Sequence, residues 1–333
     1  MDFGFDASFL NNRLTGTFDW YRRNTKDMLV AGATLPATLG ASVPKSNSAD
    51  MKTIGWELSL GWNDRLENGF SYWVKGVLSD YQATITKYAG NDAGFYSQSD
   101  GDGKYYVGQK IGEIWGYHSN GLFQSDDEAA TIDQSELYAG KWGAGDVKYE
   151  DLDNDGKITK GEETIYNPGD KSIIGNKTPR YQFGITVGFD YKNFDFEMFW
   201  QGTGKRDYML SGAQFWGFTS QWDVPYTPAL DYWTETNTDA YFPRPGWQNG
   251  GNRVTSDRYL QSAAYGRLKN LTVGYTIPKN LTTKWGISRL RLYVTGENLL
   301  TITPLNDAFD PETLGGMTYP INRKVAIGLN LTL

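Results

Sequence analysis

The chain has 333 residues, a net charge of −7, no cysteine and a single histidine, His118. The absence of cysteine excludes disulfides, thiol catalysis and cysteine-bound zinc, and the acidic balance argues against nucleic acid as a partner. Aromatic residues make up 15% of the chain and there are 39 glycines, a composition that favours strands, turns and surfaces that meet something other than water. The sequence contains no apolar run of roughly 18 residues, so a form that spans a membrane would have to be a β-barrel.

Apolar and polar residues alternate with a period of two in many segments, which predicts strands. In 3–9, 54–62 and 181–191, one face is apolar and ends in aromatics, whereas the other is small or polar. The nine expected strands lie at about 2–10, 13–29, 52–63, 70–88, 181–191, 194–204, 261–278, 288–303 and 323–333. A barrel in lipid has such an alternation, but so does a soluble β-sandwich with one face in its core.

The connections between these strands alternate between short and long. The short ones are 11–12, 64–69, 192–193 and 279–287, and the long ones are 30–51, 89–180, 205–260 and 304–322. Outer-membrane barrels show this asymmetry, with short periplasmic turns and long extracellular loops. It therefore favours an all-β, antiparallel transmembrane barrel segment over a sandwich.

Two features suggest that the natural protein begins before Met1. Bacterial single-chain barrels have an even number of strands, and a strand that starts at the first residue leaves an unpaired edge. An exported protein also needs a secretory signal, which does not open this chain. We therefore expect further strands and a signal upstream.

An acidic motif stands in the long 89–180 connection, which we expect to be an extracellular loop. The run DLDNDGKITKGE has the spacing of a twelve-residue calcium loop. Its expected Ca²⁺ ligands are the carboxylates of Asp151, Asp153, Asp155 and Glu162 and the carbonyl of Lys157. The sequence shows none of the flanking helices of an EF-hand, so a solvated acidic turn remains the alternative.

The 205–260 connection, a second expected extracellular loop, is the richest aromatic stretch of the chain. Flat rings with a polar tip can stack on sugars, and the candidates for substrate binding are Trp216, Trp222, Tyr226, Trp233 and Trp247. The alternative is that these rings pack the loop onto itself or onto a partner protein.

We find no catalytic constellation in the sequence and expect no enzyme activity. With His118 as the only histidine, we expect neither a histidine-based triad nor a histidine-rich metal site.

Several sequence motifs are distributed along the chain. The first strand pair carries a Tyr-x-x-x-Thr-Lys-Asp-x-Leu run at Tyr21, Thr25, Lys26, Asp27 and Leu29, and a Gly-x-Glu-Leu strand follows at Gly55, Glu57 and Leu58. An acidic loop, an Ile-Gly-x-x-x-Pro segment and a hairpin that ends in Gln-Gly-x-Gly follow at Ile174, Gly175, Pro179, Gln201, Gly202 and Gly204. These motifs resemble those of the SusC/RagA family of TonB-dependent outer-membrane importers, and YGRLKNLTVGYTIP and RLRLYVTGENLLTIT are similar to the family's penultimate strands.

The resemblance implies that 1–333 is the C-terminal part of a 22-stranded barrel whose plug domain and N-terminal strands are absent here. It also implies a SusD-like surface lipoprotein, energy from the TonB complex, and a glycan or peptide as cargo in an outer membrane. The rival hypothesis from another class is a secreted, calcium-dependent carbohydrate-binding β-protein that folds in water.

Overall fold

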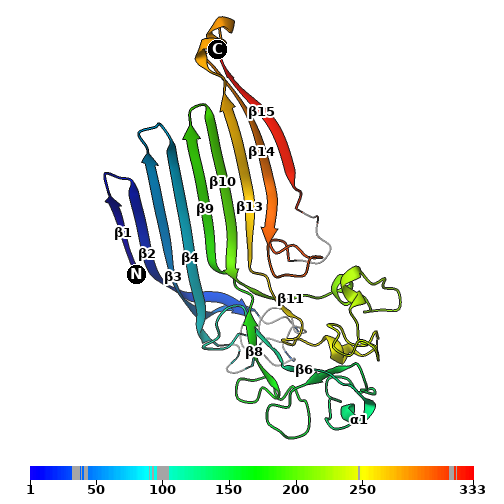
Figure 1. Ribbon diagram of the computed structural model, residues 1–333. Helices are drawn as coiled ribbons and strands as arrows, with labels where there is room; N and C mark the ends of the chain where they lie inside the picture. The colour runs from blue at the N-terminus through cyan, green and yellow to red at the C-terminus, as the bar shows by residue number, and fades with distance from the viewer. Residues whose placement is uncertain are drawn as a thin grey trace.

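The computed structural model describes the whole chain except residues 32–37, 39, 41–43, 90, 92–93, 96–104, 247, 315–318 and 320. Its main feature is a nine-stranded antiparallel sheet in the order β1-β2-β3-β4-β9-β10-β13-β14-β15 (Figure 1). These strands are β1 (Asp2–Phe9), β2 (Leu14–Ala31), β3 (Lys45–Arg65), β4 (Ser71–Tyr88), β9 (Arg180–Tyr191), β10 (Phe194–Lys205), β13 (Tyr265–Thr276), β14 (Arg289–Ile302) and β15 (Lys324–Thr332).

All nine predicted strands are confirmed, most of them to within two residues at each end. The largest difference is β3, which begins at Lys45 instead of near residue 52. Its first seven residues, KSNSADM, are polar and lack alternation, so nothing in their pattern predicts a strand. They pair with the C-terminal part of β2, where Leu29 faces Asn47 across the ladder.

The register gives the sheet two chemically different faces. Residues that pair directly across an antiparallel ladder point to the same side, and the apolar residues stay in step across all nine strands. One such row runs from Val74 through Val187, Met198 and Leu271, and an adjoining row joins Val294 to Ile327. None of these side chains is buried: Val294 is 47% exposed and Ile327 is 83% exposed, and the others are at least partly exposed. The sheet thus presents one continuous apolar face, over which the described part of the chain places no second layer.

The opposite face is polar and carries the glycines of the alternating pattern. At Gly188 an added Cβ would meet the indole of Trp73, and at Gly328 it would meet the ring of Tyr293. Each ring lies over a residue of the neighbouring strand, since Trp73 pairs with Gly188 and Tyr293 with Gly328. Glycine is required there because only hydrogen leaves room for the ring.

The strand connections are sorted by length between the two ends of the sheet, as predicted (Figure 1). One end has tight turns, and Leu10, Asn11 and Asn12 all adopt positive φ between 55° and 64°. Asparagine tolerates this left-handed region better than most residues, which explains the Asn-Asn pair. A short helical connection, α3 (Lys279–Thr282) followed by η4 (Thr283–Trp285), joins β13 to β14 at the same end.

The long connections gather at the other end, and they contain secondary structure of their own. Their strands form three two-stranded sheets, β5-β8, β6-β7 and β11-β12. The elements are β5 (Glu113–Tyr117), β6 (Ser119–Leu122), α1 (Asp126–Ala129), β7 (Val147–Tyr149), β8 (Lys171–Asn176), β11 (Asp207–Met209), α2 (Ala213–Trp216), η2 (Thr227–Leu230), η3 (Gly250–Arg253) and β12 (Leu260–Ser262). Within the described residues, the helices are all too short and too polar to cross a membrane.

Candidate functional site

Three long connections share one buried core at the loop end of the sheet. We call it the loop core: its aromatic members come from 105–179, from 206–264 and from the segment after β14. Those that are at most 9% exposed are Tyr117, Tyr149, Phe215, Trp216, Trp233, Phe242, Tyr259 and Phe309. Phe215 alone contacts five other rings, mostly edge to face. The loops therefore form a folded cap held by aromatic burial.

Buried hydrogen bonds join the first loop to the second. The Tyr149 hydroxyl donates to the carbonyl of Gly251 at 2.7 Å. The Asn252 side chain accepts from the backbone N–H of Val147 at 2.8 Å and donates to the Asp146 carboxylate at 2.8 Å. Because Asp146 and Asn252 are almost fully buried, loss of either partner would leave an unsatisfied polar group.

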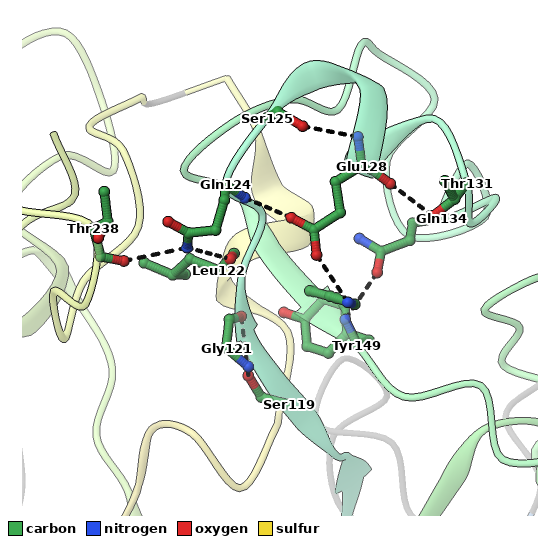
Figure 2. Close-up of polar contacts among 11 residues, drawn as sticks. Ser119, Gly121, Leu122, Gln124, Ser125, Glu128, Thr131, Gln134, Tyr149 and Thr238 are labelled. Carbon is green, nitrogen blue, oxygen red and sulfur yellow. Dashed lines mark hydrogen bonds and ion pairs between the residues drawn. The ribbon is translucent and has the colours of Figure 1, made fainter. Parts of the chain in front are cut away.

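Figure 2 shows how the first loop is held locally around α1. Ser125 caps the helix by accepting from the N–H of Glu128 at 3.1 Å, and the Glu128 carboxylate accepts in return from the N–H of Gln124 at 2.7 Å. The arrangement differs from a standard capping box, because the Glu128 carboxylate binds the N–H of the residue before the N-cap. The Gln134 side chain, 1% exposed, accepts from the N–H of Tyr149 at 2.9 Å and so extends the edge of β7.

The segment after β14 is tied back to the sheet by charge. Arg267 on β13, which is 2% exposed, pairs with Asp310 at 2.6 Å, and Lys269 pairs with Glu312 at 3.1 Å. Leu305 and Phe309 precede these two acidic residues in the chain and belong to the loop core. The polar face of the sheet and the cap are thus connected through this segment.

The predicted calcium loop forms a tight turn, in which the structure brings some of the predicted ligands together. Asp151 accepts from the N–H of Gly156 at 2.7 Å and from that of Asp155 at 3.2 Å. Among the described residues, the acidic side chains that converge within 4.8 Å of one another are Asp151, Asp153 and Asp170. Asp155 and Glu162 do not belong to that group, and the Glu162 side chain is exposed.

Asp170 is the member of this group that the sequence analysis missed. It is 1% exposed, and its carboxylate accepts from the N–H of Leu152 and from the N–H of Thr159, both at 2.7 Å. It therefore joins the two ends of the acidic turn. Partial desolvation, together with repulsion from Asp155 and Asp170, raises the pKa of the Asp153 carboxyl above its ordinary value. A divalent cation would relieve this repulsion, so the donor set of oxygens suits Ca²⁺ chemically.

The five predicted sugar-stacking residues lie in different environments. Trp216 and Trp233 are 9% and 8% exposed and belong to the loop core, so their faces are covered by protein. Trp222 is 83% exposed and Tyr226 is 45% exposed. Trp247 lies outside the described residues. Of the described four, Trp222 and Tyr226 therefore have surface to offer a ligand.

One group of contacting residues was not foreseen from the sequence. The His118 Nε2 atom lies 2.6 Å from the Ser172 hydroxyl, and its Nδ1 atom lies 2.8 Å from an oxygen of Asp257. A triad needs only one histidine, so these contacts make the three residues candidates for a further site. Ser172 and Asp257 are separated from His118 by 54 and 139 positions, so no local motif could have revealed them.

The chain is similar in sequence to known TonB-dependent receptors. The chain matches no family model. It is 29% identical to TonB-dependent receptor P3 of Formosa agariphila, over 99% of this chain and 33% of that protein. It is 26% identical to TonB-dependent receptor SusC of Bacteroides thetaiotaomicron, over 98% of this chain and 31% of that protein. The chain thus spans about a third of the length of these relatives.

Solved structures share the fold. The RagAB peptide transporter aligns with a TM-score of 0.74 at 20% identity, over 99% of this chain and 34% of its own. The RagAB peptide importer in its open-open state aligns with a TM-score of 0.75 at 22% identity. These structures confirm the predicted barrel-portion fold. The TonB-dependent relatives confirm the predicted resemblance to SusC/RagA-type proteins and the place in the outer membrane.

Proposed function

Since homologues of this chain along its whole length are TonB-dependent receptors, we propose that it forms part of an outer-membrane importer of nutrients. In this proposal the nine strands are one section of the barrel wall. The folded loops lie outside the cell and help to close over the cargo.

The observation that carries the proposal is the uncovered apolar face of the sheet. A soluble monomer rarely exposes a continuous apolar patch of more than a few hundred Å². Here the patch runs through every strand of the sheet, from Phe5, 61% exposed, to Ile327, 83% exposed. Lipid is the environment that accepts such a face, while the polar face turns toward the lumen.

The test is heat-modifiable gel mobility of the full-length protein in outer-membrane vesicles. A folded barrel resists detergent until it is boiled, so unboiled and boiled samples should run differently. Identical mobility, together with a monodisperse chain in buffer without detergent, would instead support the rival, a secreted calcium-dependent carbohydrate-binding β-protein.

The proposed cargo is an oligosaccharide or a peptide, and Trp222 and Tyr226 are the proposed contacts. Both lie in the second loop and expose ring surface, which can stack on sugars or on peptide side chains. Replacing Trp222 with Ala should weaken uptake by roughly 2- to 10-fold, the value of one aromatic contact. Uptake of labelled oligosaccharides and of labelled peptides should be measured side by side. The matched control is Trp285→Ala, since Trp285 is 64% exposed at the opposite end of the sheet.

The proposed partners are a SusD-like surface lipoprotein and the TonB complex, by analogy with the SusC and RagAB relatives. A lipoprotein would cover the loop end, where Val224 and Leu230 are 76% and 63% exposed. Affinity purification of the full-length protein should recover the lipoprotein. Recovery that is unchanged after both residues are replaced with serine would contradict this docking position.

We also propose that the acidic turn binds Ca²⁺ and thereby stiffens the first loop. Asp151, Asp153, Asp155, Glu162 and the carbonyl of Lys157 remain the proposed ligands. The structure adds Asp170, whose carboxylate lies within 4.8 Å of those of Asp151 and Asp153. Calorimetric titration of Ca²⁺ into the wild type should show one site that Asp153→Asn weakens. Asp127→Asn, which alters an exposed acid of α1, should leave the titration unchanged.

A further inference from the structure

A serine, a histidine and an aspartate form a continuous hydrogen-bonded relay on the surface of the cap. Ser172 Oγ lies 2.6 Å from His118 Nε2, and His118 Nδ1 lies 2.8 Å from Asp257 Oδ2. The other oxygen of Asp257 accepts from the backbone N–H of Ser119 at 2.9 Å. One ring nitrogen of His118 thus contacts the serine hydroxyl and the other contacts the aspartate. This is the arrangement of nucleophile, base and acid that nucleophilic catalysis requires.

The backbone holds the three residues in place from three segments. Ser172 lies on β8, where it pairs with Gly116 of β5, two residues before His118. Asp257 is fixed beside β5, because its N–H donates to the carbonyl of Tyr117 at 3.1 Å and the N–H of Tyr117 donates to the carbonyl of Thr255 at 2.9 Å. The β5-β8 ladder is also interrupted by a bulge between Ile114 and Trp115, a feature that is enriched beside active sites.

We propose that Ser172, His118 and Asp257 are a nucleophilic site that hydrolyses carboxylic esters on extracellular ligands. This activity is independent of transport and goes beyond the proposed function. A solvent-facing relay is open to ligand: the side chains of His118 and Asp257 are 32% and 39% exposed, and Ser172 is partly exposed. A partly exposed hydrogen bond adds little to stability, so a purely structural clasp is a weak reason for this arrangement.

In the proposed reaction, Ser172 Oγ attacks the carbonyl carbon of the ester and its proton passes to His118 Nε2. The tetrahedral intermediate collapses, the bond to the alcohol oxygen breaks, and His118 returns the proton to the departing alcohol. Water then attacks the acyl-serine with His118 as general base, which releases the carboxylic acid and restores Ser172. Asp257 positions the imidazole and stabilises its charge when it is protonated. Esters suit such an open site, because they need less activation than amides.

The test uses the full-length protein in outer-membrane vesicles and a fluorophosphonate probe, which reacts with activated serines. We expect the probe to label Ser172, as located by mass spectrometry of the tryptic peptide. His118→Gln should slow labelling at least about 100-fold, in line with the contribution of a general base. The same vesicles should hydrolyse p-nitrophenyl acetate, and Ser172→Ala should abolish that hydrolysis.

The matched control is Ser211→Ala, an exposed serine of the second loop outside the relay, which should leave labelling unchanged. Resistance of the cap to added protease reports separately whether each variant is folded. If Ser172 of the wild type stays unlabelled while its cap resists protease, the proposal is overturned and the relay is a clasp between loops. If labelling survives His118→Gln unchanged, Ser172 is not activated by His118 and the proposal also fails.

Discussion

The sheet and the cap bury apolar surface in opposite ways. In the sheet, one apolar face of every strand is exposed and suits the hydrocarbon of a membrane. Its stability comes from the hydrogen bonds between strands and from contact with lipid. In the cap, the aromatic residues are covered by one another, as Phe215 at 0% exposure and Tyr259 at 0% exposure show. The same residue types therefore signal lipid contact in one region and a water-soluble core in the other.

The largest effect is expected in the cap. Phe215→Ala removes the ring at the centre of the aromatic cluster and should destabilise the cap by about 3–5 kcal/mol. Because the sheet does not depend on that core, the barrel should keep its heat-modifiable mobility while the cap becomes sensitive to protease. Loss of both properties together would show that the two regions fold as one unit.

A charge on the apolar face should affect the sheet and spare the cap. Val294→Arg places a cation in the uncovered row on β14 and should cost about 2–4 kcal/mol if that row faces the middle of a bilayer. Thr295→Arg, one position along on the polar face, is the matched control and should be tolerated. Denaturant unfolding in lipid vesicles measures both, and equal costs would contradict the assignment of the faces.

A smaller effect is expected from crowding the polar face. Gly188→Ala would drive a methyl group into the indole of Trp73 and should destabilise the sheet by about 1–3 kcal/mol. Gly76→Ala, also within the sheet, meets nothing within 4 Å and serves as the control. The difference in unfolding free energy between the two variants isolates the ring contact.

The smallest effect concerns the acidic turn of the cap and its response to pH. Calcium requires deprotonated ligands, so affinity is fully present above the pKa of Asp153 and is lost as pH falls through it. Because that pKa is raised, the loss should begin at a higher pH than for an ordinary aspartate. We expect about a tenfold weakening across this range, measured by calorimetric titration at successive pH values. An affinity that is flat until ordinary aspartates titrate would remove Asp153 from the site.

The sheet could be predicted from sequence because its information is local. Alternation fixed the strands, and the connection lengths fixed which end carries the loops. The polar start of β3 was not predicted, because it is held in an extended conformation by pairing with the C-terminal part of β2. Pairing across a ladder is a long-range property that no window along the chain contains.

The cap could be predicted only in part, because its contacts join distant positions. The acidic turn was visible as a motif, yet Asp170 lies beyond the twelve-residue loop and was missed. The aromatic richness of the second loop was visible, but the pattern could not separate buried Trp233 from exposed Trp222. His118, Ser172 and Asp257 meet only after three segments have folded together.

The length of β3 has a mechanical consequence. A strand needs about 9–11 residues to cross the hydrocarbon, whereas β3 has 21 and stays paired with β4 as far as Ala49 and Tyr88. Beyond that crossing length, the paired strands β3 and β4 extend as a rigid two-stranded ladder. There, residues 108–111 of the first loop form backbone hydrogen bonds with Ala83 and Ile85 of β4. A force applied to this part of the cap would therefore be transmitted directly to the barrel wall through these backbone hydrogen bonds.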